Sequence, residues 1–138
     1  MPNTTKSSTG EAGWIAALHR LESIRELLST PEHDLPMARR EPLEAEFFDL
    51  QGKLPTEVFV AVRSRLAGDQ PLIASAYGMR CGFCNLSMPR GDHTTLLTGD
   101  EIVRCQICGV VLYAGADERQ RVASARAARE SKRAGWRQ

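Results

Sequence analysis

The four cysteines are the residues that most clearly indicate chemistry. They form two Cys-x-x-Cys pairs, Cys81 with Cys84 and Cys105 with Cys108, and twenty residues separate the pairs. Two-residue spacers let each pair bend around one ion, and an insert of this length can form a hairpin that brings the pairs together. The spacing therefore predicts one tetrahedral Zn²⁺ site with Cys81, Cys84, Cys105 and Cys108 as its ligands.

The residues that follow each pair support this prediction. Asn85 and Gly109 occupy equivalent positions, directly after the second cysteine of each pair. A metal knuckle turns sharply there, often with positive φ, and asparagine and glycine tolerate that conformation. Because four thiolates fill a tetrahedron and leave no position for a reactive water, the predicted zinc is structural.

Iron, a redox-active pair and a histidine ligand are the alternatives to a four-cysteine zinc site. Iron in a rubredoxin-like site would use the same four ligands, and spacing alone does not separate it from zinc, although cytosolic ribbons of this kind mostly hold zinc. A thioredoxin-like redox pair needs one reactive pair beside a βαβ unit, whereas this chain has two pairs and no such unit. His93 lies in the insert beside Asp92 and could substitute for a ligand, but an exposed loop histidine is the simpler interpretation.

Length and composition restrict the remaining classes of protein. A chain of 138 residues, 42% apolar and 25% charged, is one ordinary domain at most. It shows no nucleophile elbow, phosphate-cradling glycine loop or catalytic triad, so we expect neither an enzyme nor a small-molecule substrate. It also shows no signal peptide and no apolar run of membrane-spanning length, so we expect a cytoplasmic protein without a membrane partner.

Hydrophobic periodicity predicts the helices that must position the cysteines. Ser8 and Glu11 have the form of a capping box that opens a first helix. Its apolar seam, widened by Leu18 and Leu27, repeats at spacings of three and four and consists of Trp14, Ala17, Leu21, Ile24 and Leu28. Such a stripe is best explained by packing against a second helix of the same chain. The loop that ends this helix is predicted from Pro31, Pro36 and Pro42.

Two further helices follow the proline-rich loop. A short second helix, limited by Gly52 and Pro55, is indicated by the apolar repeat Leu43, Phe47, Leu50 and Leu54. Pro55 suits the first turn of a third helix, whose inner face would consist of Val58, Val62 and Leu66 with Phe59 beside them. Together the three segments predict an antiparallel helical hairpin or small bundle.

An extended lead-in and two short β-type runs surround the cysteines. Residues 72–77 lead into the first pair, and residues 102–104 and 110–113 flank the second, as in a ribbon hairpin. A ribbon of roughly forty residues has too small a core to fold alone, so its metal must supply stability, as in zinc-finger peptides, where binding contributes about 10 to 16 kcal/mol.

The predicted fold class is α+β, mainly α, in five segments. Residues 1–7 are expected to be disordered, 8–67 to form the helical hairpin or a short coiled coil, and 68–76 to be a linker. Residues 77–115 would form the four-cysteine zinc ribbon, and 116–138 a basic tail that is either helical or disordered.

Charge is distributed unevenly along the chain. From Asp117 onward there are seven basic and three acidic side chains, a net of +4, while the rest of the chain has eleven basic and fourteen acidic ones, a net of −3. If the tail is helical, an arc of roughly 80° would contain Arg119, Arg126, Arg129, Arg133 and Arg137. The alternative is a solvated tail in which Asp117 pairs with Arg121 and Glu130 intrudes on the same arc.

Several stretches of the chain resemble the bacterial C4-type zinc-ribbon proteins: residues 54–55, 77–84, 86–89, 102–105 and 108–113. Gln106 stands where that family often has proline, and Val110 where arginine is common. The resemblance implies a helical hairpin or coiled coil before a ribbon whose four cysteines bind zinc. It also implies a nucleic-acid-binding or regulatory role.

Two functions follow from these expectations. The first is a regulatory protein that binds nucleic acid, RNA ahead of DNA, or a ribonucleoprotein, through the arginines of the tail. The second is an adaptor whose helical hairpin and ribbon bind a protein of the transcription or translation machinery. Exposure of Trp14 or Phe48 would favour the adaptor.

Overall fold

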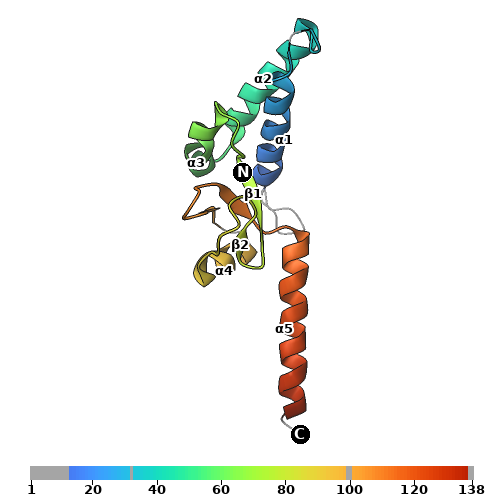
Figure 1. Ribbon diagram of the computed structural model, residues 1–138, viewed down its shortest axis with the longest axis vertical. Coiled ribbons are helices and arrows are strands. Elements are labelled where there is room, and N and C mark those ends of the chain that lie inside the picture. Colours follow the sequence, from blue (N-terminus) through green and yellow to red (C-terminus); the bar gives the residue numbers. More distant parts are fainter. Residues whose placement is uncertain (1–12, 32, 99–100, 137–138) are drawn as a thin grey trace.

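Figure 1 shows a helical half at one end of the molecule, a small sheet in the middle and a long C-terminal helix at the other end. The computed structural model describes residues 13–31, 33–98 and 101–136. Within this part of the chain, the fold is α+β and mainly α, as predicted. The predictions for residues 1–7, for the capping box at Ser8 and Glu11 and for Arg137 lie outside the described residues.

The helical hairpin consists of α1 (Gly13–Leu28) and α2 (Met37–Lys53), and α3 (Thr56–Leu66) follows it directly. Arg20 joins α1 to α2, because its guanidinium donates to both carboxylate oxygens of Glu46 at 2.7 and 2.9 Å. The prediction that Pro42 belongs to a loop is wrong, since this residue lies inside α2. Pro42 is exposed, so the backbone hydrogen bond that it cannot donate is lost on the solvent side of the helix.

The buried face of α1 differs slightly from the predicted seam. Leu21 and Ile24 are buried as expected, but Trp14, Ala17 and Leu28 are half-buried and Leu27 is 44% exposed. The face is displaced because α1 contacts β1 as well as α2. Coverage from two sides gives a buried face that consists of Ile15, Leu18, Leu21 and Ile24.

The sheet contains β1 (Ile73–Tyr77), β2 (Arg80–Cys81), β3 (Val103–Arg104) and β4 (Val111–Tyr113), in the order β2-β1-β4-β3. β1 pairs with β2 and β4 with β3 as antiparallel hairpins, and β1 runs parallel to β4 at the centre. The strands predicted around the second cysteine pair are thus present. The extended lead-in predicted at 72–77 is β1, so the segment 68–76, interpreted as a linker, includes most of a central strand.

The helical half and the sheet share one hydrophobic core. Leu72 beside β1 and Val111 on β4 are fully buried in the same cluster as Leu18 of α1 and Val62 of α3. The ribbon therefore does not stand apart from the helices, because Ile73 of β1 and Val111 of β4 pack in the core with α1 and α3, while Ala76 and Leu112 of the same strands lie in a second cluster with the cysteines.

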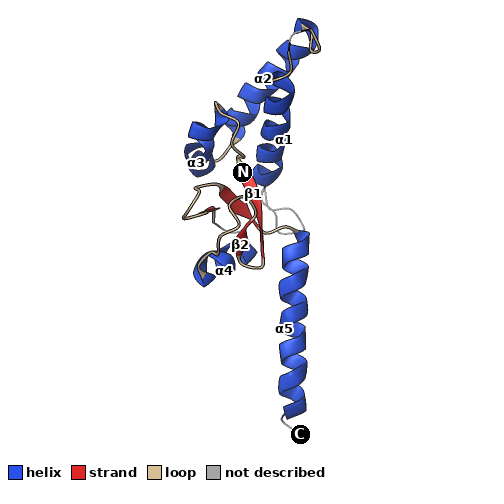
Figure 2. Ribbon diagram, in the orientation of Figure 1, coloured by secondary structure: helices blue, strands red, loops and turns tan. Residues whose placement is uncertain are grey.

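Two more helices complete the fold. The insert between the cysteine pairs contains α4 (Arg90–Thr98), which lies on the other side of the sheet from the hairpin (Figure 2). The tail forms α5 (Ala116–Trp136), which extends away from the body (Figure 1). Of the two alternatives for the tail, helix or disorder, the structure shows the helix.

Candidate metal centre

The four cysteines converge as the spacing predicts. Their Sγ atoms all lie within 4.8 Å of one another, and all four are free thiols. Two of the distances cross between the pairs, 3.7 Å from Cys81 to Cys108 and 3.6 Å from Cys84 to Cys105. Ligands at about 2.3 Å from one zinc would be about 3.8 Å apart at the corners of a tetrahedron. The cluster therefore fits a single metal ion.

Both knuckles have the predicted turn. Asn85 has φ 64° and Gly109 has φ 81°. Each donates its backbone N–H to the carbonyl of the first cysteine of its pair, Asn85 to Cys81 and Gly109 to Cys105, both at 2.9 Å. The expectation of positive φ at these two positions is confirmed.

The knuckles contain a second repeat that the sequence analysis missed. An arginine directly precedes each pair, and its guanidinium reaches around the turn to the carbonyl of the positive-φ residue. Arg80 donates to Asn85 at 3.1 Å and Arg104 to Gly109 at 3.2 Å. The shared pattern Arg-Cys-x-x-Cys followed by Asn or Gly was the available signal.

The first knuckle is pressed against the central strand at Gly82. A Cβ atom at this position would lie 2.2 Å from the carbonyl oxygen of Ser75 on β1. A side chain does not fit there without backbone movement, so glycine allows the first cysteine pair to lie close to the sheet.

Backbone N–H groups point at the sulfur atoms, as a site for thiolates requires. Phe83 donates to Cys81 Sγ at 3.4 Å and Cys108 to Cys105 Sγ at 3.5 Å. Burial raises the pKa of Cys105, but the N–H groups of Cys108 and Ile107 outweigh burial and lower that pKa to about 6. Burial raises the pKa of Cys108 to about 12. Without a cation the thiols do not all ionise together, and a bound metal ion would stabilise all four thiolates.

His93 is not the exposed loop residue expected from the sequence. It lies on α4, retains only 7% exposure, and its Nε2 atom is 2.6 Å from Glu118 Oε2 on α5. It is also not one of the clustered metal-ligating residues. The prediction failed because it treated the insert as a plain hairpin loop, whereas α4 turns His93 and Leu96 inward.

Glu118 is the centre of a buried polar network at the base of α5. Besides His93, it accepts hydrogen bonds from the Gly78 N–H at 3.1 Å and from Arg121 at 2.7 and 3.0 Å. Burial raises the pKa of this carboxyl, but the hydrogen bonds from Arg121, Gly78 and His93 outweigh burial and lower it to about 2. Arg121 thus pairs with Glu118 and not with Asp117 as expected, and it also lies 5.5 Å from the centre of the Tyr77 ring.

Arg119 is hydrogen-bonded to the body of the protein. Its guanidinium donates to the carbonyls of Leu97 at 2.7 Å, Ala114 at 3.2 Å and Leu96 at 3.4 Å. It therefore satisfies carbonyls in the last turn of α4, which ends at Thr98. The sequence analysis grouped Arg119 with the other tail arginines because they all lie on the same side of the helix axis. Arg119, however, is the one closest to the ribbon.

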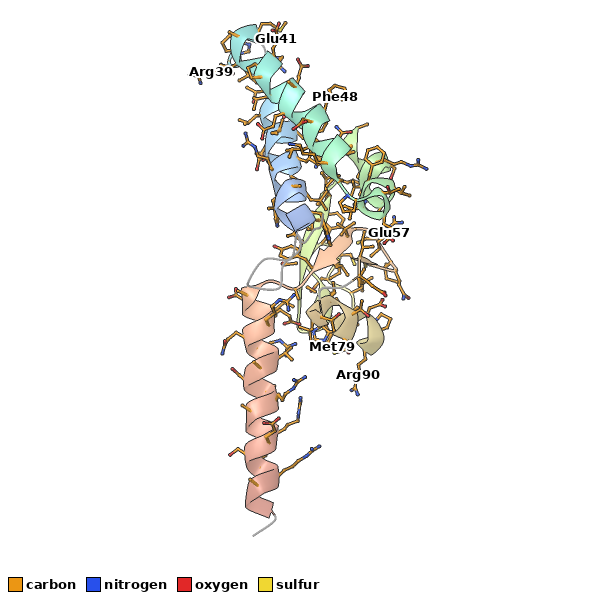
Figure 3. All side chains as sticks on the ribbon, turned by 180° about the vertical axis from the view of Figure 1, so that it is seen from behind. Arg39, Glu41, Phe48, Glu57, Met79 and Arg90 are labelled. Atoms are coloured by element: carbon orange, nitrogen blue, oxygen red, sulfur yellow. The ribbon has the colours of Figure 1, made fainter. Side chains whose placement is uncertain are left out.

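The other predicted arginines that the structure describes are free. Arg126, Arg129 and Arg133 are exposed, and among the described residues their side chains make no hydrogen bond or ion pair. They share a helix face with Arg119, which points at α4, and in Figure 3 nitrogen-tipped side chains along α5 project toward the side on which α4 lies. Glu130 is exposed on the same helix. We call Arg126, Arg129 and Arg133 the basic face of α5.

No helix in the described part of the chain combines the length and hydropathy that a membrane crossing requires. Comparisons of the chain with protein-family models, curated proteins and solved structures find no match.

Proposed function

We propose that this chain is a non-enzymatic, cytoplasmic zinc-ribbon protein that binds nucleic acid, RNA ahead of DNA, through the basic face of α5. The observation that carries the proposal is that Arg126, Arg129 and Arg133 lie unpaired on an exposed helix whose first turn is fixed to the ribbon. Guanidinium groups pair with phosphates through charge and bidentate hydrogen bonds, and such contacts are independent of base sequence.

The metal supports this role by holding the ribbon together. Cys81, Cys84, Cys105 and Cys108 would hold one Zn²⁺, which supplies cross-linking stability and no open coordination position. Iron remains the alternative metal, because it would accept the same thiolates. The resemblance to the bacterial C4-type zinc-ribbon proteins is consistent with this assignment and stays part of the proposal.

The base of α5 supports the proposal because its contacts with the body fix the direction in which the exposed part of the helix extends. Glu118, Arg119 and Arg121 bind the ribbon, so the first turn of the helix is ordered by the body. A preordered helix loses less conformational entropy on binding than a tail that folds on its target. The exposed part then presents its three arginines together.

Substitution of the basic face is the test of this proposal. Cutting the chain at Ala116 would also remove Glu118 and Arg119, so the variant Arg126→Ala/Arg129→Ala/Arg133→Ala is preferable. A control that removes the same charge elsewhere is Arg39→Ala/Arg63→Ala/Lys132→Ala, since all three side chains are exposed and lie outside the basic face. Binding is measured to single-stranded and duplex RNA and DNA of equal length.

We expect the basic-face variant to weaken RNA binding at least tenfold and the control variant to weaken it less than threefold. Equal weakening by both variants would show that binding depends on the net charge of the protein and not on the position of these three arginines. Unchanged binding by the basic-face variant would show that the basic face of α5 does not bind the nucleic acid.

The second candidate is the adaptor, and one observation favours it. Phe48 on α2 is 76% exposed, although it is a large aromatic residue on an ordered helix. Exposed aromatic side chains of this kind often anchor protein interfaces. Trp14 gives weaker support because it is half-buried. If neither RNA nor DNA binds, Phe48→Ala in a search for protein partners is the next experiment.

A further inference from the structure

Arg65 is a buried arginine whose charge has no carboxylate partner in the described part of the chain. It lies on α3, retains 9% exposure, and takes part in none of the ion pairs there. Its guanidinium donates to two backbone carbonyls, from Nη1 to Pro71 at 3.1 Å and from Nη2 to Cys108. Arginines are rarely buried without an acidic partner, because carbonyl groups satisfy hydrogen bonds but do not neutralise the charge.

The position of this guanidinium relates it to the metal centre. Cys108, whose carbonyl accepts from Arg65, is one of the four clustered cysteines. A Cβ atom built on Gly109 would lie 3.5 Å from Arg65 Nη2, so the guanidinium lies directly against the second knuckle. Four thiolates around a divalent ion have a net charge of −2, and an arginine is a suitable counter-charge for such a site.

We propose that Arg65 supplies the counter-charge of the metal centre and thereby couples metal binding to the docking of α3 on the ribbon. The inference rests on the proposed zinc site. With the metal bound, the guanidinium lies against a knuckle of a dianionic centre; without the metal, four thiolates are not held together beside it, and its burial is not compensated in the same way. Metal binding therefore favours the docked position of α3, and by linkage the docked α3 favours metal binding.

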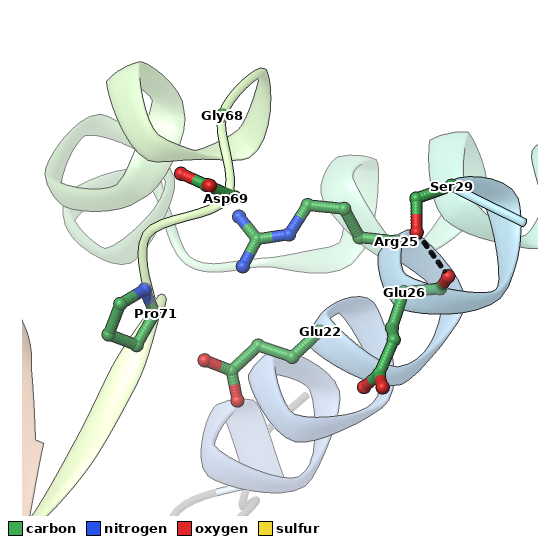
Figure 4. A pocket seen from close by; sticks show the side chains of 7 residues that line it. All are labelled: Glu22, Arg25, Glu26, Ser29, Gly68, Asp69 and Pro71. Carbon is green, nitrogen blue, oxygen red and sulfur yellow. Dashed lines mark hydrogen bonds between the residues drawn. The ribbon is translucent and has the colours of Figure 1, made fainter.

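Arg25 extends this coupling to the first helix. Figure 4 shows the Arg25 side chain reaching from α1 across a groove of about 420 Å³ toward the turn that follows α3. Its Nη1 atom donates to the carbonyl of Arg65 at 2.8 Å, and its Nη2 atom donates to that of Gln70 at 2.7 Å. The backbone that carries Arg65 is thus tied to α1, so displacement of Arg65 would loosen the helical half as well.

Arg104 offers a matched comparison. It also contacts the second knuckle, through Nε to the carbonyl of Gly109 at 3.2 Å. Its side chain is exposed, so water and salt screen its charge. If charge at the knuckle matters only when buried, removal of Arg104 should have a much smaller effect than removal of Arg65.

The first measurement is zinc affinity of the full chain, by competition with a chromogenic chelator. We expect Arg65→Met and Arg65→Gln to weaken zinc binding about tenfold to a hundredfold, which corresponds to about 1.4 to 2.8 kcal/mol. Arg65→Lys keeps the charge and should stay within about fivefold of the unaltered chain, and Arg104→Met within about threefold. Equal affinities for Arg65→Met and the unaltered chain would overturn the proposal.

The second measurement separates charge from packing. Thermal unfolding is compared with and without zinc, and we expect Arg65→Met to lower the Tm of the zinc form while leaving the Tm of the metal-free form unchanged or higher. Equal lowering of both would show a purely structural side chain and would overturn the proposal. If the unaltered chain binds no zinc, the proposed metal centre fails first, which is a different result from a zinc-binding chain that is indifferent to Arg65.

Discussion

The Oε2 atom of Glu118 on α5 lies 2.6 Å from the Nε2 atom of His93 on α4, and both side chains are buried. The contact joins the C-terminal helix to the helix inserted between the two cysteine pairs. Because the Gly78 N–H, between β1 and β2, donates to the same carboxylate, the first turn of α5 belongs to the fold of the ribbon. The rest of α5 is then an arm with a fixed base.

Removal of the Glu118 carboxylate is predicted to be strongly destabilising. Glu118→Ala leaves His93 without its partner and removes the acceptor of the Gly78 N–H, so we expect a loss of about 3 to 5 kcal/mol in the free energy of unfolding. Urea unfolding of the zinc-loaded protein measures this change in the free energy of unfolding. Glu130→Ala is the control, because Glu130 is exposed on the same helix and should change stability by less than about 0.5 kcal/mol. A similar small change in both variants would contradict the role of Glu118.

The pH dependence of stability should contain a contribution from the same residue. The pKa of Glu118 is about 2 in the folded protein, below its ordinary value of 4.5. The carboxylate therefore stabilises the fold above pH 4.5, and this contribution, about 3 kcal/mol, is lost as the pH falls from 4.5 toward 2. Because thiolates also take up protons in acid, the informative quantity is the difference between the unaltered chain and Glu118→Gln. That difference should shrink through this pH range; a difference that does not vary with pH would refute the prediction.

Gly82 should tolerate no side chain. Gly82→Ala places a methyl group 2.2 Å from the Ser75 carbonyl oxygen, so the knuckle must move away from β1. We expect a loss of more than about 2 kcal/mol in stability together with weaker zinc binding. Gly91→Ala is the matched substitution, because a Cβ atom there meets nothing within 4 Å and the residue lies in α4. It should be neutral or stabilise the protein by up to about 1 kcal/mol, and a similar loss for the two variants would count against the close contact at Gly82.

Metal removal should unfold the ribbon and weaken the helical half. Cys81 and Cys105 are buried in the core of the ribbon, and β1 and β4 also contribute to the core beneath α1 and α3. We expect Cys105→Ser to lose stoichiometric zinc and the dispersed amide signals of residues 73–113 in NMR spectra. Elemental analysis of the unoxidised protein also separates zinc from iron. A metal-free variant with native spectra would contradict a structural metal.

The cysteine cluster could be predicted from the sequence because its determinants are local. The two Cys-x-x-Cys pairs fix where the ligands are, and Asn85 and Gly109 mark turns that depend on the conformation of one residue each. β3 (Val103–Arg104) and β4 (Val111–Tyr113) follow from the short β-type runs at 102–104 and 110–113. These features require no knowledge of distant contacts.

The remaining contacts depend on pairs of residues far apart in the chain. Glu118 is buried by His93, 25 positions away, and Arg65 by the carbonyl of Cys108, 43 positions away. Glu118 lies among polar neighbours on α5, so nothing around it indicates burial. Arg65 follows the buried Val58 and Val62 at helical spacing, which places it on the apolar face of α3, but arginines are rarely fully buried and the sequence does not indicate a buried guanidinium. α4 has only nine residues and two leucines, which is too short for a clear helical period. Arg119 looked equivalent to Arg126 because a helical wheel shows the angle of a side chain around the helix axis and not how far along the helix it lies from the body of the protein.

The salt dependence of RNA binding shows whether the basic face of α5 contacts phosphates. We expect log Kd of the unaltered chain to change steeply with log salt concentration, and the variant Arg126→Ala/Arg129→Ala/Arg133→Ala to reduce that slope by about two to three units, since each neutralised phosphate contributes about 0.7 to 0.9. The control Arg39→Ala/Arg63→Ala/Lys132→Ala should leave the slope within about one unit of the original. An unchanged slope in the basic-face variant, or binding that does not respond to salt, would contradict the account that α5 binds a phosphate backbone.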